Sequence, residues 1–175
     1  MEENQMIKAV YAGVFDPFTK GHLDIVKRSL SFCNQLVIAI GINSTKTTMF
    51  SEPERIKQIN YTIDKEIEFL SSTNIMVTSF QGLLVDYAKS VDATVLVRGI
   101  RSVSDFEYEI NLTNINKILA PHIETVFLPT SPELAVVSSS MVKEIAKHGG
   151  DISQFVPAHI AKAVNDKFGF IKSGT

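Results

Sequence analysis

The chain has 175 residues, 45% hydrophobic and 21% charged, as expected for a globular domain, and its single cysteine, Cys33, excludes an internal disulfide and a cysteine-based zinc site. A formal net charge of −2 and a pI near 6.1 give no electrostatic basis for binding nucleic acid. Because the N-terminal segment lacks the apolar core of a signal peptide and no apolar run approaches the ~18 residues of a membrane span, we expect a cytoplasmic protein with no membrane partner.

Strands and helices are predicted to alternate along the chain. Short, nearly continuous runs rich in valine and isoleucine predict strands at 7–11, 36–42, 75–80, 94–97 and 125–128, which is typical of strands buried on both faces. Helical periodicity and capping signals predict helices at 22–33, 51–64, 83–90, 104–119, 139–148 and 157–175. This order predicts one α/β domain over residues 1–175, built on a doubly wound, five-stranded parallel sheet, with residues 1–5 flexible.

Local signals mark two helix ends. Ser51 and Glu54 have the spacing of a capping box, with a proline in the first turn of the helix that follows. Gly149 and Gly150 come directly after the helix at 139–148 and predict its C-cap.

The helix predicted at 104–119 is apolar on more than one side. Asp105, Glu109 and Asn116 form a polar stripe, while Phe106 and Ile110 belong to a second apolar surface. The first apolar stripe consists of Tyr108, Leu112, Ile115 and Leu119. We therefore expect this helix to be covered by the core and by a second body, either a substrate or another subunit.

Polar and glycine-containing segments follow four of the predicted strands. After the first, second, fourth and fifth strands the chain reads GVFDPFTKGH, NSTKTTMF, RGIRSVSDFEYE and PTSPELAVVSSS. Ligands of open parallel sheets bind in the crevice beyond the carboxyl ends of the strands. The sequence therefore predicts a ligand site at this edge of the sheet.

The loop after the first strand predicts an anion site. Gly13 is expected to allow a tight turn and to leave room for a ligand, while Pro17 and Gly21 shape the loop. His22 falls in the first turn of the next helix, where free N–H groups and the positive end of the helix dipole favour an anion. Gly21 and His22 alone are better explained as a turn with a capping histidine; the whole loop at a sheet edge favours a phosphate site.

Three cations are candidates for the same site. Arg98 and Arg101 flank the fourth strand's end, and guanidinium groups match phosphate oxygens in bidentate geometry. The alternative is a pair of surface ion pairs with Asp105 and Glu107. Lys46 follows the second strand, and the alternative interpretation is that it is an ordinary solvated lysine.

Three consecutive serines, Ser138 to Ser140, enter the helix predicted at 139–148. One serine there is an ordinary N-cap, whereas three supply hydroxyl and backbone N–H groups to a polyphosphate. A plain polar turn is the rival interpretation.

Several catalytic patterns are absent from the sequence. GINSTKT lacks the second glycine of a P-loop, and neither a G-x-G-x-x-G dinucleotide motif nor a G-x-S-x-G nucleophile elbow occurs. The histidines lack metalloprotease spacing. The sequence therefore predicts no covalent nucleophile.

Taken together, these segments resemble one family. GVFDPFTKGH resembles the S/T/H-x-G-H loop of the nucleotidyltransferase superfamily, and RGIRSVSDFEYE with SSSMVKEIA narrows the resemblance to the bacterial phosphopantetheine adenylyltransferases of coenzyme A biosynthesis. The resemblance runs from residue 9 to residue 157. It implies a Rossmann-like fold and the transfer of the adenylyl group of ATP to 4′-phosphopantetheine, giving dephospho-coenzyme A and pyrophosphate. It also implies Mg²⁺ held mainly by the ATP phosphates, a homohexamer, and feedback binding of coenzyme A.

The resemblance implies roles for individual residues. His22 would stabilise the α-phosphate in the transition state, while Lys46 and Arg98 would hold the substrate phosphate. Arg101 and Ser139 would hold the ATP phosphates. The implied ATP site comprises Gly13, Val14, Phe15, His22, Gly99, Ile100, Arg101, Glu109, Leu134, Ala135, Val136, Val137, Ser138, Ser139 and Ser140. The implied phosphopantetheine site comprises Val14, Lys46, Leu84, Arg98, Tyr108 and Asn116.

Two places depart from the family pattern. Val14 stands where the family usually has Thr or Ser, so a hydroxyl that contacts the substrate phosphate is missing, with the loss of a hydrogen bond worth about 0.5–1.5 kcal/mol. Leu134 and Ala135 replace the aromatic and hydroxyl residues common before the serines, which leaves backbone contacts to the nucleotide there.

Three alternatives stay open. Another adenylyl- or cytidylyltransferase, such as one acting on nicotinate mononucleotide, is disfavoured by the block from Arg98 to Glu109. A nucleotide-binding regulatory protein with impaired turnover is favoured by Val14, and ATP binding without release of pyrophosphate would identify it. A purely structural oligomer leaves the grouping of His22, the arginines and the serines unexplained.

Overall fold

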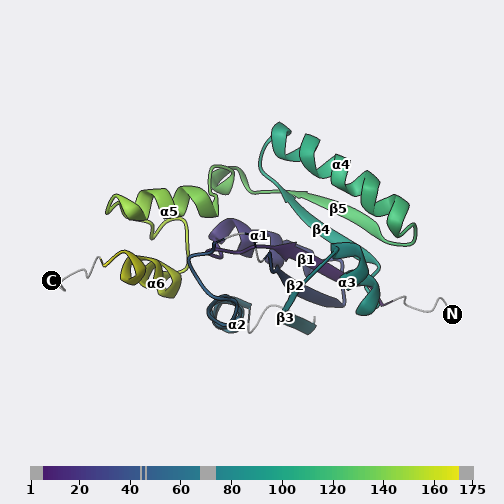
Figure 1. The fold of residues 1–175 in the computed structure, drawn as a ribbon, viewed down its shortest axis with the longest axis horizontal. Helices are drawn as coiled ribbons and strands as arrows, with labels where there is room; N and C mark the ends of the chain where they lie inside the picture. Colours follow the sequence, from purple (N-terminus) through teal and green to yellow (C-terminus); the bar gives the residue numbers. More distant parts are fainter. Residues whose placement is uncertain (1–5, 44, 46, 68–73, 170–175) are drawn as a thin grey trace.

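The computed structural model describes residues 6–43, 45, 47–67 and 74–169. A parallel sheet with the strand order β3-β2-β1-β4-β5 forms its centre (Figure 1). The strands are β1 (Lys8–Gly13), β2 (Gln35–Gly41), β3 (Asn74–Phe80), β4 (Val95–Ile100) and β5 (Glu124–Pro129). The helices are α1 (Lys20–Ser29), α2 (Glu52–Ile67), α3 (Leu84–Ser90), α4 (Val103–Leu119), the short 3₁₀ helix η1 (Pro132–Leu134), α5 (Ser139–Lys147) and α6 (Ala158–Phe168). The predicted α/β fold with five parallel strands is confirmed.

Each face of the sheet carries its own hydrophobic core. In β2, Leu36 and Ile38 point into a cluster completed by α1, α2, α5 and α6, whereas Val37 and Ala39 point into a second cluster that contains residues of α3. Helices therefore cover both faces of the sheet, as in a doubly wound fold. This arrangement explains why the strand sequences are apolar at successive positions rather than at alternate ones.

Two strands extend by two or more residues beyond their predicted carboxyl ends. β1 continues to Gly13, which pairs with Ile40, and β4 continues through Gly99, which pairs with Leu128. The expectation of a tight turn at Gly13 is wrong, because Gly13 is the last residue of a paired strand. The ladder of backbone hydrogen bonds continues at these positions because it depends on the backbone and not on apolar side chains.

Helix ends follow the expected signals, with two exceptions. The first helix, expected over 22–33, is α1 from Lys20 to Ser29, because the N–H groups of Ser31 and Phe32 bond to carbonyls three residues back and form a turn. The Glu54 carboxylate accepts hydrogen bonds from the Ser51 N–H at 2.7 Å and the Ser51 hydroxyl at 2.9 Å, and Gly149 adopts a φ of 75° after α5. The last helix was expected over 157–175, but α6 ends at Phe168 because Gly169 adopts a left-handed φ of 75°. Residues 1–5, predicted to be flexible, lie outside the described residues.

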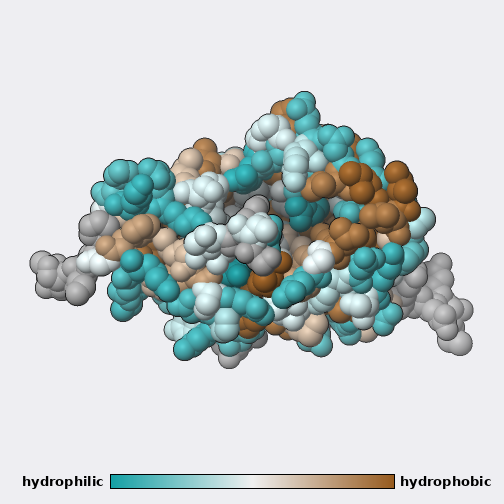
Figure 2. All heavy atoms as spheres, in the orientation of Figure 1, coloured by the Kyte–Doolittle hydropathy of each residue, from teal (hydrophilic) through white to brown (hydrophobic). Residues whose placement is uncertain are grey.

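Helix α4 lies at the β5 edge of the sheet (Figure 1) and has no buried residue. Phe106 packs against Phe127 of β5, with 5.4 Å between the ring centroids. Several large apolar side chains of α4 stay exposed, and a brown area near α4 and β5 is visible in Figure 2. They are Val103, Phe106, Tyr108, Ile110, Ile115, Ile118 and Leu119.

None of the described helices is long and apolar enough to cross a bilayer.

Candidate active site

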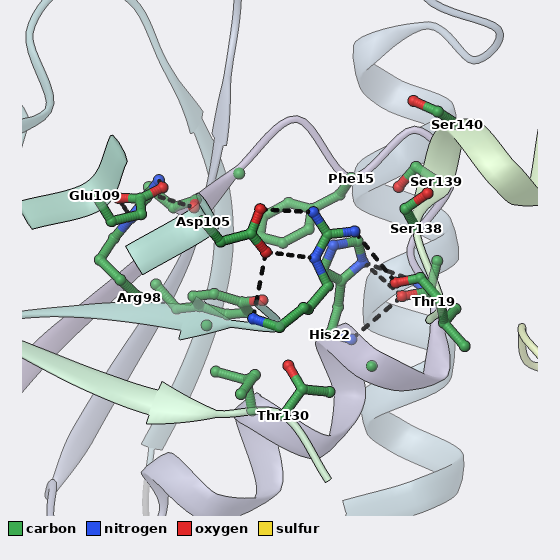
Figure 3. Close-up of a pocket in the computed structure, with 18 of the residues that line it drawn as sticks. Phe15, Thr19, His22, Arg98, Asp105, Glu109, Thr130, Ser138, Ser139 and Ser140 are labelled. Carbon is green, nitrogen blue, oxygen red and sulfur yellow. Dashed lines mark hydrogen bonds and ion pairs between the residues drawn. The ribbon is translucent and has the colours of Figure 1, made fainter. Parts of the chain in front are cut away.

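A cavity of about 330 Å³ lies at the carboxyl ends of β1 and β4. The first turns of α1 and α5 form one side of it, with Ser138 to Ser140, and α4 contributes Glu109 on the opposite side (Figure 3). Helix N-termini carry backbone N–H groups without intrahelical partners and a partial positive charge. Two such termini at one cavity favour a ligand with several anionic groups.

His22 is held by a reciprocal cap at the start of α1. The Thr19 side chain accepts a hydrogen bond from the His22 backbone N–H at 3.3 Å, and the Thr19 backbone N–H donates to Nδ1 of His22 at 3.0 Å (Figure 3). Because a backbone N–H can only donate, Nδ1 must be the unprotonated nitrogen of the ring. The neutral imidazole therefore carries its proton on Nε2, where it is a donor for a ligand.

Burial, and to a smaller extent the nearby positive charge of Arg101, lower the pKa of His22 from 6.5 to about 4. His22 is thus a neutral hydrogen-bond donor at neutral pH. It is not an extra cation in the pocket.

Phe15 packs against the His22 ring and has an uncommon backbone conformation. Its φ is 51°, a left-handed value that few non-glycine residues adopt, and its side chain is 2% exposed. Its ring contacts Tyr11, Phe18 and His22 at centroid distances of 5.3, 5.6 and 5.1 Å. A Cβ on Gly13 would lie 2.8 Å from this ring, so Gly13 is required for the position of Phe15.

Gly21 has a different reason to lack a side chain. A Cβ there would make ordinary contacts, the nearest 3.5 Å from the Thr19 hydroxyl oxygen, and its backbone φ is not in the left-handed region. Gly21 nevertheless lines the cavity. The protein itself therefore has space for a larger residue, and the missing side chain leaves that space to a ligand.

Arg98 forms an ion pair with Glu109 of α4. Its Nε donates to Glu109 at 2.7 Å, its Nη2 donates to the other carboxylate oxygen, and its Nη1 donates to the carbonyl of Ala12 at 3.0 Å (Figure 3). The predicted alternative partner, Glu107, is not the one observed. Guanidinium has five N–H groups, so this arrangement orients Arg98 and leaves N–H groups for a ligand.

Arg101 forms the ion pair with Asp105 that was considered as the alternative to a ligand contact. Nε of Arg101 lies 2.9 Å from one Asp105 oxygen and Nη2 lies 3.2 Å from the other. Among the described residues, the charged side chains lining the cavity are Arg98 and Arg101 against Asp105 and Glu109, which sum to zero when His22 is neutral. An incoming polyphosphate meets donors that are already oriented, in a pocket without net positive charge from these residues.

The serines at the start of α5 have separate functions in the structure. Ser138 is the N-cap, and its side chain accepts from the backbone N–H of Met141 at 3.1 Å. The Ser139 hydroxyl donates to the carbonyl of Pro17 at 2.8 Å and so joins α5 to the β1–α1 loop. One serine is therefore an N-cap and all three line the cavity, while their contact with a polyphosphate stays a prediction.

Val14 faces a second, smaller cavity of about 200 Å³. Its side chain is 42% exposed, and its carbonyl accepts a hydrogen bond from Nη1 of Arg55 at 2.8 Å. Arg55 is buried, and its Nε has no hydrogen-bond partner among the described residues. Residue 14 therefore lies beside the main cavity, with its backbone fixed by α2.

The structure gathers most, but not all, of the predicted site residues. Those lining the main cavity are Gly13, Phe15, His22, Arg98, Gly99, Arg101, Tyr108, Glu109, Val137, Ser138, Ser139 and Ser140. Those that do not line it are Val14, Leu84, Ile100, Asn116, Leu134, Ala135 and Val136. Lys46 lies outside the described residues, so its predicted role is not tested.

Seven lining residues were not among the predicted site residues, namely Tyr11, Ala12, Thr19, Gly21, Ile25, Asp105 and Thr130. Tyr11 lies within a buried strand, and burial raises the pKa of its hydroxyl, so it remains protonated. Thr19 could have been found from its spacing, because it precedes His22 by the three residues of a capping box, although histidine replaces the usual Glu or Gln. Thr130 directly follows β5, in a segment already expected to face the site.

No group of three or more His, Cys, Asp or Glu side chains in the described part of the chain is arranged to hold a metal ion. The two cavity carboxylates, Asp105 and Glu109, are both occupied by arginines. A divalent cation at this site would fit best as one carried by the phosphates of a nucleotide.

Sequence comparison finds close relatives over most of the chain. The profile of the cytidylyltransferase-like family matches residues 10–145. The phosphopantetheine adenylyltransferase of Caldanaerobacter subterraneus subsp. tengcongensis is 46% identical over 160 residues, covering 91% of this chain and 96% of the relative. That of Alkaliphilus oremlandii is 44% identical over 160 residues, covering 91% and 98%.

Structure comparison finds the same fold in more distant proteins. The nicotinic acid mononucleotide adenylyltransferase of Plasmodium falciparum aligns with a TM-score of 0.66 and 14% identity over 93% of this chain and 94% of that one. A bifunctional NMN adenylyltransferase/ADP ribose pyrophosphatase from Francisella tularensis gives 0.68 and 14% over 94% and 50%. At this level of identity the likeness establishes the fold alone.

Proposed function

Since the chain belongs to the phosphopantetheine adenylyltransferases, within the cytidylyltransferase-like family, we propose that its cavity transfers the adenylyl group of ATP to 4′-phosphopantetheine. The products are dephospho-coenzyme A and pyrophosphate. The observation that carries the proposal is His22, a neutral Nε2–H donor placed among two helix N-termini and two arginines.

The reaction is a direct displacement at phosphorus. A phosphate oxygen of 4′-phosphopantetheine forms a bond to the α-phosphorus of ATP, and the bond from that phosphorus to the bridging α–β oxygen breaks. Pyrophosphate leaves with the electron pair. The nucleophile is already anionic, so the chain needs neither a covalent nucleophile nor a general base, and none is proposed.

Catalysis then consists of alignment and charge stabilisation. Holding two anions in line can lower the barrier by up to about 7–11 kcal/mol. His22 donates from Nε2 to an α-phosphate oxygen as charge develops, and its orientation is fixed in advance by Thr19. Arg98 and Lys46 hold the substrate phosphate, while Arg101 and the first turn of α5 hold the phosphates of ATP.

We propose Mg²⁺ as the cofactor, held mainly by the ATP phosphates. When bound, it neutralises part of the phosphate charge. The pairing of Arg98 and Arg101 with Asp105 and Glu109 supports this proposal, because these four charges cancel and Lys46 is the one further cation proposed for the site. Those two carboxylates orient arginines and are not assigned as metal ligands.

Assembly and feedback belong to the same proposal. The exposed apolar side chains of α4 support a homohexamer, in which other copies of the chain cover this helix. Sedimentation should give a particle of six times 19.4 kDa. Coenzyme A contains both the adenylyl and the phosphopantetheine parts of the product. We therefore propose that it competes with the substrates for the cavity. A cytoplasmic location remains a prediction.

Release of pyrophosphate from ATP and Mg²⁺ tests the function. It should depend on 4′-phosphopantetheine, and the second product should have the mass of dephospho-coenzyme A. Nicotinate mononucleotide serves as the competing acceptor. Turnover with nicotinate mononucleotide alone, or ATP binding without pyrophosphate release, would refute the proposal.

A further inference from the structure

Asp16 forms a buried connection between three segments of the chain. One oxygen accepts from the Met49 N–H at 2.8 Å and from Nζ of Lys143 at 3.0 Å, and the other accepts from the Phe50 N–H at 2.9 Å. The Asp16 residue is 3% exposed. A buried carboxylate is costly unless donors surround it, and here two backbone N–H groups and one ammonium do so.

The three segments are distant in the sequence. Asp16 belongs to the β1–α1 loop, Met49 and Phe50 directly precede α2, and Lys143 is on α5. The contacts span 33, 34 and 127 residues of sequence, so the carboxylate makes no local turn with these partners. Its contacts set how these segments lie relative to one another.

Each of these segments carries or adjoins groups assigned to the reaction. The β1–α1 loop leads into α1, whose first turn carries His22; α5 begins beside Ser138, and Met49 follows Lys46 by three positions. Two further bonds join the β1–α1 loop to α5 and to α2 itself, namely Ser139 Oγ to the Pro17 carbonyl at 2.8 Å and Arg55 Nη1 to the Val14 carbonyl at 2.8 Å. Asp16 is the member of this set that binds both the segment before α2 and α5.

We propose that Asp16 is a positioning residue, which aligns the segment before α2 and the start of α5 with His22. It lines neither cavity and so acts through the residues it holds. This inference rests on the proposed function. Because in-line displacement depends on alignment, misplacing these segments should reduce turnover more than it reduces ATP binding.

Asp16→Asn tests the proposal. It keeps the shape of the side chain but removes the charge and points an NH₂ group at a donor. The matched control is Glu54→Gln, since the Glu54 carboxylate also accepts from a backbone N–H and a lysine, Ser51 at 2.7 Å and Lys167 at 3.0 Å, but joins α2 to α6 away from the cavity.

We expect kcat of Asp16→Asn to fall by about tenfold or more, with its dissociation constant for ATP within about threefold of the wild type. Glu54→Gln should keep kcat within about twofold of the wild type, even if its melting temperature falls by as much as that of Asp16→Asn. A merely structural Asp16 would lower the melting temperature and leave kcat per folded enzyme unchanged, and that result overturns the proposal.

Two further measurements cover the remaining outcomes. If Asp16→Asn does not fold, Lys143→Gln removes one of the three donors, and kcat should fall in the same direction; an unchanged kcat counts against the proposal. If the wild-type protein makes no dephospho-coenzyme A, the proposed function fails by itself. Hydrogen exchange then decides about Asp16, because its replacement should accelerate exchange at the Met49 and Phe50 amides, and unchanged exchange overturns the inference.

Discussion

The backbone N–H of Thr19 lies 3.0 Å from Nδ1 of His22, and this contact determines which ring nitrogen can donate to a ligand. A histidine free to flip or to change tautomer would offer a lone pair to a phosphate in part of its population. Here the acceptor nitrogen is occupied by the chain itself, so the donor is prepared before any substrate binds.

Replacing His22 with alanine should therefore affect the transition state most. We expect kcat to fall by about 10²–10³-fold, because one preorganised donor to developing charge is lost, while the dissociation constant for ATP changes little. His148→Ala is the control, since His148 is an exposed residue bonded to Glu144 outside the cavity. Pre-steady-state rates and calorimetry measure the two quantities. A loss of ATP affinity as large as the loss of rate would refute this role.

The protonation of His22 gives a second prediction. Its pKa of about 4 lies below the ordinary value of 6.5, so between these pH values the unfolded chain binds more protons than the folded one. The stability contributed by His22 is complete above pH 6.5 and decreases as pH falls toward 4. Nitrogen-15 NMR should show the Nε2–H tautomer at neutral pH and no titration near 6.5, with His22→Gln identifying the signal. A midpoint near 6.5 would contradict the assignment.

Two glycines of the cavity should respond in opposite ways to alanine. Gly13→Ala places a methyl group 2.8 Å from the Phe15 ring, so we expect about 1–3 kcal/mol of destabilisation and loss of activity. Gly21→Ala makes only ordinary contacts within the protein, so its melting temperature should be unchanged or higher. Its KM for ATP should rise by about tenfold or more, because the methyl group occupies ligand space. Thermal melts and steady-state kinetics of both variants make the comparison, and an unchanged KM in Gly21→Ala would contradict it.

The sequence predicted the elements well because their signals are local. Strand periodicity, the Ser51–Glu54 cap and the glycine after α5 each involve residues within one turn or one strand, and each is present in the structure. The ends of β1 at Gly13 and of β4 at Ile100 were missed because cross-strand pairing, not apolar content, extends these strands.

The site was predictable only in part. His22 and the arginines could be located because each follows a predicted strand and has a side chain suited to phosphate. The partners of those groups could not be located in the same way: Glu109 rather than Glu107 binds Arg98, and Asp16 finds its partners 33 or more residues away. Such contacts depend on how elements pack, which the spacing of residues along one element does not determine.

Val14→Thr tests the departure from the family pattern. The Val14 side chain is 42% exposed, so a hydroxyl of the same shape can be accommodated without burying an unpaired polar group. We expect unchanged stability and an equal or higher kcat/KM for 4′-phosphopantetheine, up to about tenfold for one added hydrogen bond. Steady-state kinetics decide the matter. A large decrease would show that the neighbouring cavity has adapted to valine.

Helix α4 buries none of its own residues, yet it brings Asp105, Tyr108 and Glu109 to the cavity. Helices in proteins gain most of their stability from packing an apolar face, and α4 finds little such packing within its own chain. If a second copy provides that packing, the position of Glu109 depends on association between chains, and so on the protein concentration. The orientation of Arg98, which Glu109 holds, then depends on it as well. The enzyme should then lose specific activity on dilution, and the activity of each chain becomes a property of its concentration as well as of its sequence.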